Sequence, residues 1–161
     1  MLGLGNGNGD GLTPSGGSLR KVVWYKTDFS TDLGGWTDPV HDALSLDVIP
    51  GTSTSALKFE SQFGGSQFIL LDEVDYQNSW PQGDVRMGYT VRVYATTDLQ
   101  YLYGQTESGQ GRSIAVPANT LFEVSSALED TNAGGLSLVC EADSGNVGDI
   151  YFSDIEFYYY V

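Results

Sequence analysis

The feature that most constrains the fold of this 161-residue chain is a series of short strand-like segments separated by turn-forming residues. In the segment MGYTVRVYA, the apolar residues Tyr89, Val91 and Val93 recur at every second position, which is the period of a strand with one buried face. Turn formers such as Gly, Pro, Asn and Asp separate the segments, at the spacing typical of a β-sandwich. We expect strands over Lys21–Phe29, Ala43–Ile49, Ala56–Glu60, Gln67–Leu71, Arg86–Ala95, Gln100–Gln105, Leu121–Leu128, Gly135–Ala142 and Asp149–Tyr160. The pattern therefore predicts an all-β fold.

The amino-acid composition favours the same fold class. The chain contains 21 Gly, 10 Tyr, 7 Phe and 3 Trp, and aromatic residues are enriched in strands. A chain of this length fits one domain with its own hydrophobic core. The single cysteine, Cys140, excludes an internal disulfide, and it alternates with Leu136 and Leu138. This alternation predicts a buried thiol that packs as a small hydrophobic residue.

The N-terminal residues 1–19, MLGLGNGNGDGLTPSGGSL, differ in composition from the rest of the chain. Isolated leucines such as Leu2, Leu4 and Leu12 cannot bury enough surface to offset the entropy of ordering this segment. The segment also lacks the basic and apolar regions of a secretory signal peptide. We expect a flexible Gly-rich arm that becomes ordered on a neighbouring subunit, followed by one domain over residues 20–161; the alternative is a frayed terminus.

The closing segment predicts a β-bulge. Ile150 and Phe152 share one phase of the alternation, whereas Ile155 and Phe157 share the other. One extra residue near Ser153-Asp154 would reconcile the two phases, because a bulge places two residues of one strand opposite one residue of its partner.

The charge of the chain excludes one class of partner. The formal net charge is −14, with only seven Lys and Arg, and binding to nucleic acid depends on basic side chains that displace counterions. We therefore predict no nucleic-acid partner. The same charge disfavours anionic membrane surfaces, and no apolar run approaches the length that spans a membrane.

The order of several motifs resembles the jelly-roll carbohydrate-binding modules. These motifs are Asp28-Phe29, Leu33-Gly34-Gly35-Trp36, Ser55-Ala56-Leu57-Lys58-Phe59, Gly88-Tyr89-Thr90-Val91-Arg92-Val93 and the closing Ile150-Tyr151-Phe152-Ser153-Asp154-Ile155-Glu156-Phe157. The resemblance covers about residues 22–161 and implies a jelly-roll β-sandwich of two antiparallel sheets. It specifies the fold better than the function, because one fold hosts many functions.

This resemblance also implies a structural calcium ion (Ca²⁺) between the first and last strands. Such modules often hold the ion with an early acid and an Asp of the closing strand, and Asp28 and Asp154 match these places. Hard oxygen ligands suit calcium, and a bulge at Asp154 would aim its side chain inward. The alternative is that both carboxylates are exposed or cap nearby amides.

Glycan binding would need an exposed aromatic surface, because sugar rings stack on flat π surfaces while polar neighbours contact the hydroxyls. Tyr101 and Tyr103 lie two residues apart, and therefore on one face of a strand, with Gln105 as a hydrogen-bonding neighbour. Trp80 lies in an expected loop. The alternative for each aromatic residue is a place in the core or between subunits; Trp36, after two glycines, is expected in the core.

The opening Leu-Gly-Leu-Gly-Asn resembles the start of small structural proteins of tailed bacteriophages, which are assembled in the host cytoplasm. Together with the arm, this resemblance implies a virion component, such as a capsid decoration protein, that binds other virion proteins and further copies of itself. Homotrimers are common among such proteins. Leu2, Leu4, Leu12, Tyr158 and Tyr160 would form the interface.

The sequence offers little for catalysis. No Gly-x-Ser-x-Gly segment presents a nucleophile. The single histidine, His41, lies near Asp38 and Asp42 and is interpreted as a loop residue flanked by solvated acids. We predict a non-enzymatic structural protein of a virion, with a carbohydrate-binding module that holds a host glycan as the alternative.

Overall fold

The computed structural model describes residues 19–39, 44–61, 67–71, 86–105, 111–128, 136–142 and 148–161. Within these ranges every regular element is a strand, and none is a helix with the length and hydropathy needed to cross a membrane. The strands are β1 (Lys21–Thr27), β2 (Trp36–Thr37), β3 (Leu44–Val48), β4 (Ser55–Ser61), β5 (Gln67–Leu71), β6 (Arg86–Ala95), β7 (Leu99–Gln105), β8 (Ile114–Val116), β9 (Phe122–Leu128), β10 (Leu136–Ala142) and β11 (Gly148–Tyr160). The N-terminal residues 1–18, with Leu2, Leu4 and Leu12, lie outside the described residues.

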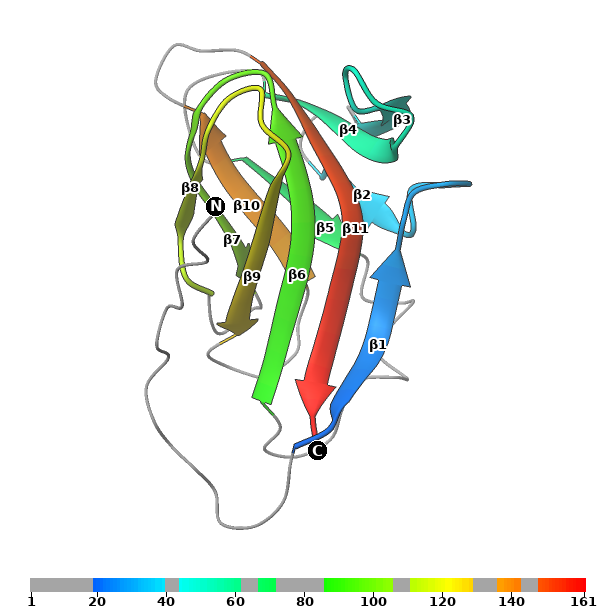
Figure 1. The fold of residues 1–161 in the computed structure, drawn as a ribbon, viewed down its shortest axis with the longest axis vertical. Coiled ribbons are helices and arrows are strands. Elements are labelled where there is room, and N and C mark those ends of the chain that lie inside the picture. The colour runs from blue at the N-terminus through cyan, green and yellow to red at the C-terminus, as the bar shows by residue number, and fades with distance from the viewer. Residues whose placement is uncertain are drawn as a thin grey trace, which may run out of the picture.

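The strands form two antiparallel sheets packed face to face (Figure 1). Sheet A has the order β3-β4-β11-β6-β9, and β1 also pairs with β11. Sheet B has the order β2-β5-β10-β7-β8. The long strand β11 lies in the interior of sheet A, with β6 along one side and β4 followed by β1 along the other. The predicted jelly-roll sandwich of two antiparallel sheets is thus confirmed.

Every segment expected as a strand is a strand, and the differences lie at the ends. The first strand ends at Thr27 instead of Phe29, because Phe29 has a φ of 55° and leaves the extended conformation. Two strands were not expected, β2 and β8, which contain 2 and 3 residues. Alternation cannot be recognised over so few residues, so these strands depend on their partners in sheet B.

The predicted bulge in the closing strand is also confirmed. Ser153 pairs with Arg92 and Glu156 pairs with Thr90, so two residues of β11 lie opposite one residue of β6. One of the two is Asp154, whose φ of 49° is in the left-handed region. Ile150 and Phe152 before the bulge and Ile155 and Phe157 after it are all buried in the core. The extra residue of the bulge makes this possible although the two pairs differ in the phase of their alternation.

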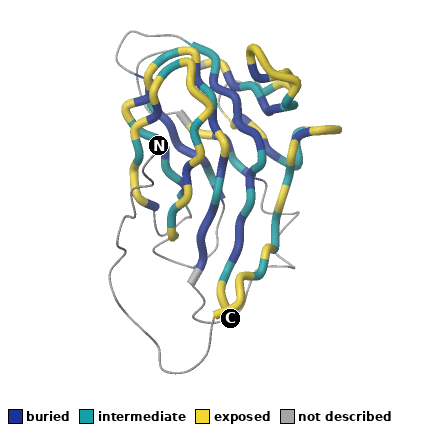
Figure 2. The backbone as a smooth tube through the Cα atoms, viewed as in Figure 1, coloured by how far each residue is buried: buried dark blue, intermediate teal, exposed yellow. Residues whose placement is uncertain are grey.

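The core contains an aromatic cluster centred on Phe157. Its ring centroid lies 5.8 Å from that of Trp24, 6.0 Å from Tyr25, 6.2 Å from Trp36 and 6.1 Å from Tyr89. Figure 2 shows the buried residues running along β6 and β11, through the middle of sheet A. The cluster joins the two sheets, because Trp36 belongs to β2 of sheet B whereas Phe157 belongs to β11 of sheet A.

Trp36 is buried, as the sequence predicts, and a glycine turn holds it in place. Its indole Nε1 donates a hydrogen bond of 2.9 Å to the Tyr25 hydroxyl, which in turn donates to the Gly34 carbonyl at 2.7 Å. Gly34 and Gly35 have φ values of 61° and 85°. Residues with a side chain are strained in this region, so the two glycines make the turn before Trp36 feasible.

Cys140 is buried in the core as a free thiol, which confirms the prediction made from its neighbours. Burial raises its pKa to about 12. The reactive thiolate is therefore scarce in the native protein at pH 8. We expect a thiol reagent to label Cys140 only in denaturant, and rapid labelling of the native protein at pH 8 would contradict this placement.

Candidate functional site

The outer face of sheet B carries the aromatic residues that the sequence singles out. Along β7, Leu102 and Gly104 are buried, whereas Tyr101, Tyr103 and Gln105 are half-buried. This alternation places the two tyrosines and the glutamine on the face of the sheet that points away from the core.

Strand β10 completes this face, because it pairs with β7 on one side and β5 on the other. Val139 pairs with Tyr103 and also with Phe68, so the three residues form one row across the sheet. In the next row, Glu141 pairs with Tyr101. We call these five residues the tyrosine platform.

The tyrosine platform combines a broad apolar surface with an ordered carboxylate. The ring centroids of Tyr101 and Tyr103 lie 5.6 Å apart, with 35° between the ring planes. The Tyr101 hydroxyl donates a hydrogen bond to a Glu141 carboxylate oxygen. Phe68 is 38% exposed, whereas Val139 is only 5% exposed and lies between the two outer strands of the row. A flat aromatic ring packs against the C–H surface of a sugar, and a hydrogen-bond acceptor held in place beside the ring can bind the sugar hydroxyls. The tyrosine platform offers both kinds of group.

Sheet B lacks positive charge on its strands. The strand residues of β2, β5, β7, β8 and β10 include no Lys or Arg, and Glu141 is their one acid. The hydrogen-bonding groups of this face are therefore the hydroxyls, amides and carboxylate of residues such as Tyr101, Gln105 and Glu141. Such a face is suited to an uncharged ligand.

The tyrosine platform contains two of the residues selected from the sequence and three that were missed. Tyr101 and Tyr103 belong to it, and Gln105 extends the same side of β7, whereas Trp80 lies outside the described residues. The sequence analysis missed Phe68, Val139 and Glu141. The alternation that predicts a buried Cys140 also places Glu141 on the opposite face. Alternation does not indicate which strands lie beside β10, so it could not bring Glu141 together with Tyr101.

The two carboxylates proposed for calcium lie near each other in the register of the sheet. Thr27, the last residue of β1, pairs with Ile155, so Asp28 directly follows this pair on one chain segment and Asp154 directly precedes it on the other. The Asp28 side chain accepts the Ser30 N–H at 3.0 Å, and hydrogen bonds from Ser30 lower its pKa. The Asp154 carboxylate accepts a hydrogen bond from Arg92 Nη1 at 3.3 Å.

These contacts do not by themselves fit a calcium site. Calcium takes six to eight oxygen ligands, and a guanidinium on Asp154 competes with a cation for the same oxygen. In the described part of the chain, no group of three or more His, Cys, Asp or Glu could hold a metal ion. The calcium ion therefore stays an untested prediction.

The tyrosines expected at a subunit interface differ in exposure. Tyr158 is 8% exposed and lies across Gly88, with Lys21 Nζ 4.0 Å from its ring centroid. Tyr160 is 37% exposed and packs edge-on against Tyr158. Tyr160 thus presents more surface to a partner, and an interface at these residues stays a prediction.

No protein-family model matches the sequence, and no curated protein matches it. Solved structures match over most of the chain. The CBM22-1 and GH10 modules of Clostridium thermocellum endo-1,4-beta-D-xylanase 10B, in complex with xylohexaose, match with a TM-score of 0.63 and 18% identity, over 85% of this chain and 28% of that one. This chain thus spans less than a third of that enzyme fragment.

Single modules match over nearly their whole length. The CBM22-1 xylan-binding domain of Paenibacillus barcinonensis Xyn10C has a TM-score of 0.60 and 10% identity, over 89% of this chain and 97% of that one. A family 29 carbohydrate-binding module, a point mutant of CBM29-2, has a TM-score of 0.53 and 9% identity, over 88% of this chain and 92% of that one. This protein therefore has the jelly-roll fold that carbohydrate-binding modules also have.

Proposed function

We propose that this protein is a non-enzymatic glycan-binding module whose ligand lies on the tyrosine platform. One observation carries the proposal. The Tyr101 and Tyr103 rings lie side by side on the outer face of sheet B, next to a carboxylate that Tyr101 holds by a hydrogen bond. Aromatic rings pack on the C–H face of a sugar, and a carboxylate can accept hydrogen bonds from its hydroxyls.

The charge of the protein defines the chemical class of this glycan. The strands of sheet B carry no Lys or Arg, and the whole chain has a net charge of −14. A polysaccharide of uronic acids would meet a negative field and no cationic residue on the strands of sheet B. The ligand is therefore a neutral glycan.

The comparisons support the glycan-binding proposal over a role in a virion. Each of the three matching structures named above contains a carbohydrate-binding module; one is a xylan-binding domain and one is in complex with xylohexaose. None of these likenesses supports a role in a virion. These likenesses concern the fold alone. A virion role, a homo-oligomer and a location in a phage particle stay predictions from the sequence alone.

Replacing Tyr103 with alanine tests the proposal. We expect the full-length protein to bind at least one of three neutral probes, xylohexaose, cellohexaose or mannohexaose, and the Tyr103→Ala variant to bind that probe at least tenfold more weakly. A tenfold loss corresponds to about 1.4 kcal/mol, which is in the range for removing a contacting aromatic ring. Isothermal titration calorimetry measures the affinity.

Two controls make this experiment specific. The Leu121→Ala variant truncates another exposed apolar side chain, which lies outside sheet B, and its affinity should equal that of the unmodified protein. Polygalacturonate, a polymer of uronic acids, should not bind. The proposal fails if none of the three hexasaccharides binds, or if Tyr103→Ala and Leu121→Ala have the same affinity.

A further inference from the structure

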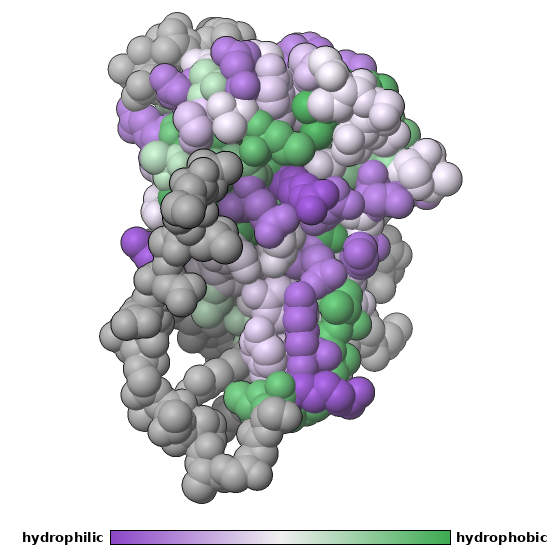
Figure 3. Space-filling model, in the orientation of Figure 1, coloured by the Kyte–Doolittle hydropathy of each residue, from purple (hydrophilic) through white to green (hydrophobic). Residues whose placement is uncertain are grey.

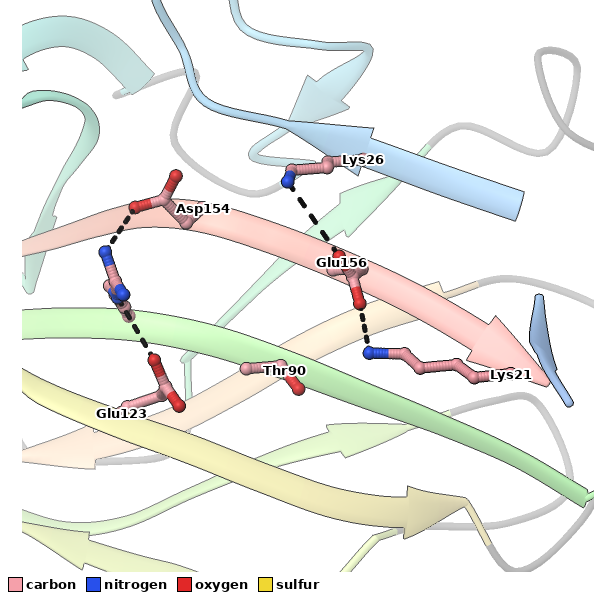
Figure 4. Close-up of a pocket in the computed structure, with 7 residues that line it drawn as sticks. Lys21, Lys26, Thr90, Glu123, Asp154 and Glu156 are labelled. Carbon is pink, nitrogen blue, oxygen red and sulfur yellow. Dashed lines mark hydrogen bonds and ion pairs between the residues drawn. The ribbon is translucent and has the colours of Figure 1, made fainter. Parts of the chain in front are cut away.

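A polar cleft lies on the outer face of sheet A, opposite to the tyrosine platform. It has a volume of about 420 Å³, within the range of small-molecule sites. Three basic and three acidic side chains surround one hydroxyl, as Figure 4 shows, and the lining residues are Lys21, Lys26, Thr90, Arg92, Glu123, Asp154 and Glu156. These residues come from β1, β6, β9 and β11, so the cleft crosses four strands of the sheet.

The charged side chains of the polar cleft form two separate networks. In the first, Glu156 lies between two lysines: Lys21 bonds one carboxylate oxygen, and Lys26 Nζ lies 3.9 Å from the other. In the second, Arg92 lies between two carboxylates, with Nε 3.1 Å from Glu123 Oε2 and Nη1 3.3 Å from Asp154 Oδ2.

The three positive and three negative charges balance, so the polar cleft has no net preference for an ion of either sign. A cation or an anion would also have to break one of the existing pairs.

A hydroxyl group can enter these networks without breaking them. It donates one hydrogen bond and accepts others, so it can bridge an ammonium and a carboxylate at the same time. The separation of 3.9 Å between Lys26 Nζ and Glu156 Oε2 is too long for a direct hydrogen bond but suits such a bridge. The Lys26 side chain is 62% exposed, so a ligand can reach its ammonium group from the solvent.

Pairs of tyrosines lie beyond both ends of the polar cleft. Tyr94 and Tyr151 pack edge-on with ring centroids 5.9 Å apart, and Tyr158 and Tyr160 do so at 5.7 Å. Tyr94 and Tyr158 are neighbours of Arg92 and Glu156 on their own strands, two residues away on the same face.

In Figure 3 a hydrophilic band crosses this side of the molecule, with apolar patches above it and a mixed surface of apolar and hydrophilic side chains below it. From Tyr94 to Gly88 along β6 the face extends about 20 Å at the ordinary rise of a strand. A polar middle between amphipathic ends, on an elongated face, fits a chain of hydroxyl-bearing rings better than a single small molecule.

We propose that the polar cleft is a second binding site for a neutral oligosaccharide, so that one copy of the protein binds two sugar chains on opposite faces. The ligand hydroxyls bridge Lys26 to Glu156 on one side and contact Arg92 and its carboxylate partners on the other. Thr90 lies between the two networks (Figure 4). The proposal goes beyond the function assigned to the tyrosine platform and does not depend on it, because the two faces share no residue.

The second site is tested by NMR on the full-length Tyr103→Ala variant, in which binding at the tyrosine platform is expected to be weakened. The measured quantity is the chemical shift of each backbone amide. Xylohexaose, cellohexaose and mannohexaose are titrated separately to millimolar concentration. We expect at least one of them to shift the amide signals of Thr90 and Arg92 in a saturable way. Adding Arg92→Gln should weaken this binding at least tenfold, because it removes the guanidinium that joins the Glu123 and Asp154 carboxylates in one network.

Arg112→Gln is the matched control, because it removes the same charge outside the lining of the polar cleft, and it should leave the affinity unchanged. Lys26→Met is a second test on the other network, should Arg92→Gln fail to fold. The proposal is overturned if no hexasaccharide shifts Thr90 or Arg92, or if Arg92→Gln and Arg112→Gln bind equally well. In the unmodified protein, a shift of the Glu141 amide signal reports binding at the tyrosine platform. The two proposals can therefore be confirmed or rejected independently.

Discussion

Replacing Phe157 with alanine should lower the free energy of unfolding by about 3–5 kcal/mol. Phe157 is fully buried, and its ring lies against four other aromatic rings that come from three strands and both sheets. The truncation removes a large apolar side chain and leaves a cavity that these rings fill only in part. Aromatic packing adds to the loss, because each ring pair contributes beyond its buried area.

Urea unfolding followed by tryptophan fluorescence measures this change. Tyr160→Ala is the control on the same strand, since Tyr160 is 37% exposed, and it should cost less than about 1 kcal/mol. If Phe157→Ala unfolds at nearly the same urea concentration as Tyr160→Ala, the aromatic cluster does not hold the two sheets together as described.

Replacing Gly104 with valine should cost about 3 kcal/mol, at the upper end of the usual cost of overpacking. A Cβ atom at Gly104 would lie 2.7 Å from Tyr89 Cε1 and 2.9 Å from Tyr89 Cδ1. Tyr89 is fully buried and extends from β6 of sheet A toward β7 of sheet B. A Cβ atom at Gly111 would lie 3.1 Å from the same ring, so Gly111 is also close and the tyrosine ring has little space to move away.

A double-mutant cycle with Tyr89→Leu identifies the cause of this loss. If the valine collides with the tyrosine ring, the smaller leucine relieves the collision, and the double variant is more stable than the sum of the single changes predicts. A coupling free energy near zero would show that Gly104 is required for another reason. Thermal unfolding of the four proteins gives the values.

The Gly104 contact also connects stability to the proposed function. Gly104 lies between Tyr103 and Gln105 on β7, and its close contact with Tyr89 fixes the distance between β7 and sheet A. A valine there would displace the strand that carries the tyrosine platform. We therefore expect Gly104→Val to weaken glycan binding at the tyrosine platform as well.

Most of the strands could be predicted from the sequence because each depends on local information. Alternation in β6, turn formers between segments and the change of phase in β11 are all visible within about ten residues. The sequence analysis missed the strands that are not determined by their own residues. The strands β2 and β8 are too short to show alternation, and they exist because β5 and β7 offer them backbone partners.

The candidate sites depended more strongly on the tertiary structure. The sequence places Tyr101 and Tyr103 on one face of a strand, but Phe68 and Glu141 are far from Tyr101 along the chain and join it only through the pairing of β5, β10 and β7. The polar cleft likewise gathers residues from four strands. Lys21 and Glu156, its most distant pair in the sequence, meet because β1 pairs with β11.

By itself, the sequence determined the fold class, the strands long enough to alternate, the bulge near Asp154 and the burial of Cys140 and Trp36. These follow from the period of a strand and from the tendency of apolar side chains to leave water, both of which act on neighbours in the chain. The tertiary structure decided which strands are adjacent, and therefore which side chains share a surface. Strand order depends on long-range backbone pairing and on the packing of two sheets, and these interactions leave no mark in any short stretch of sequence.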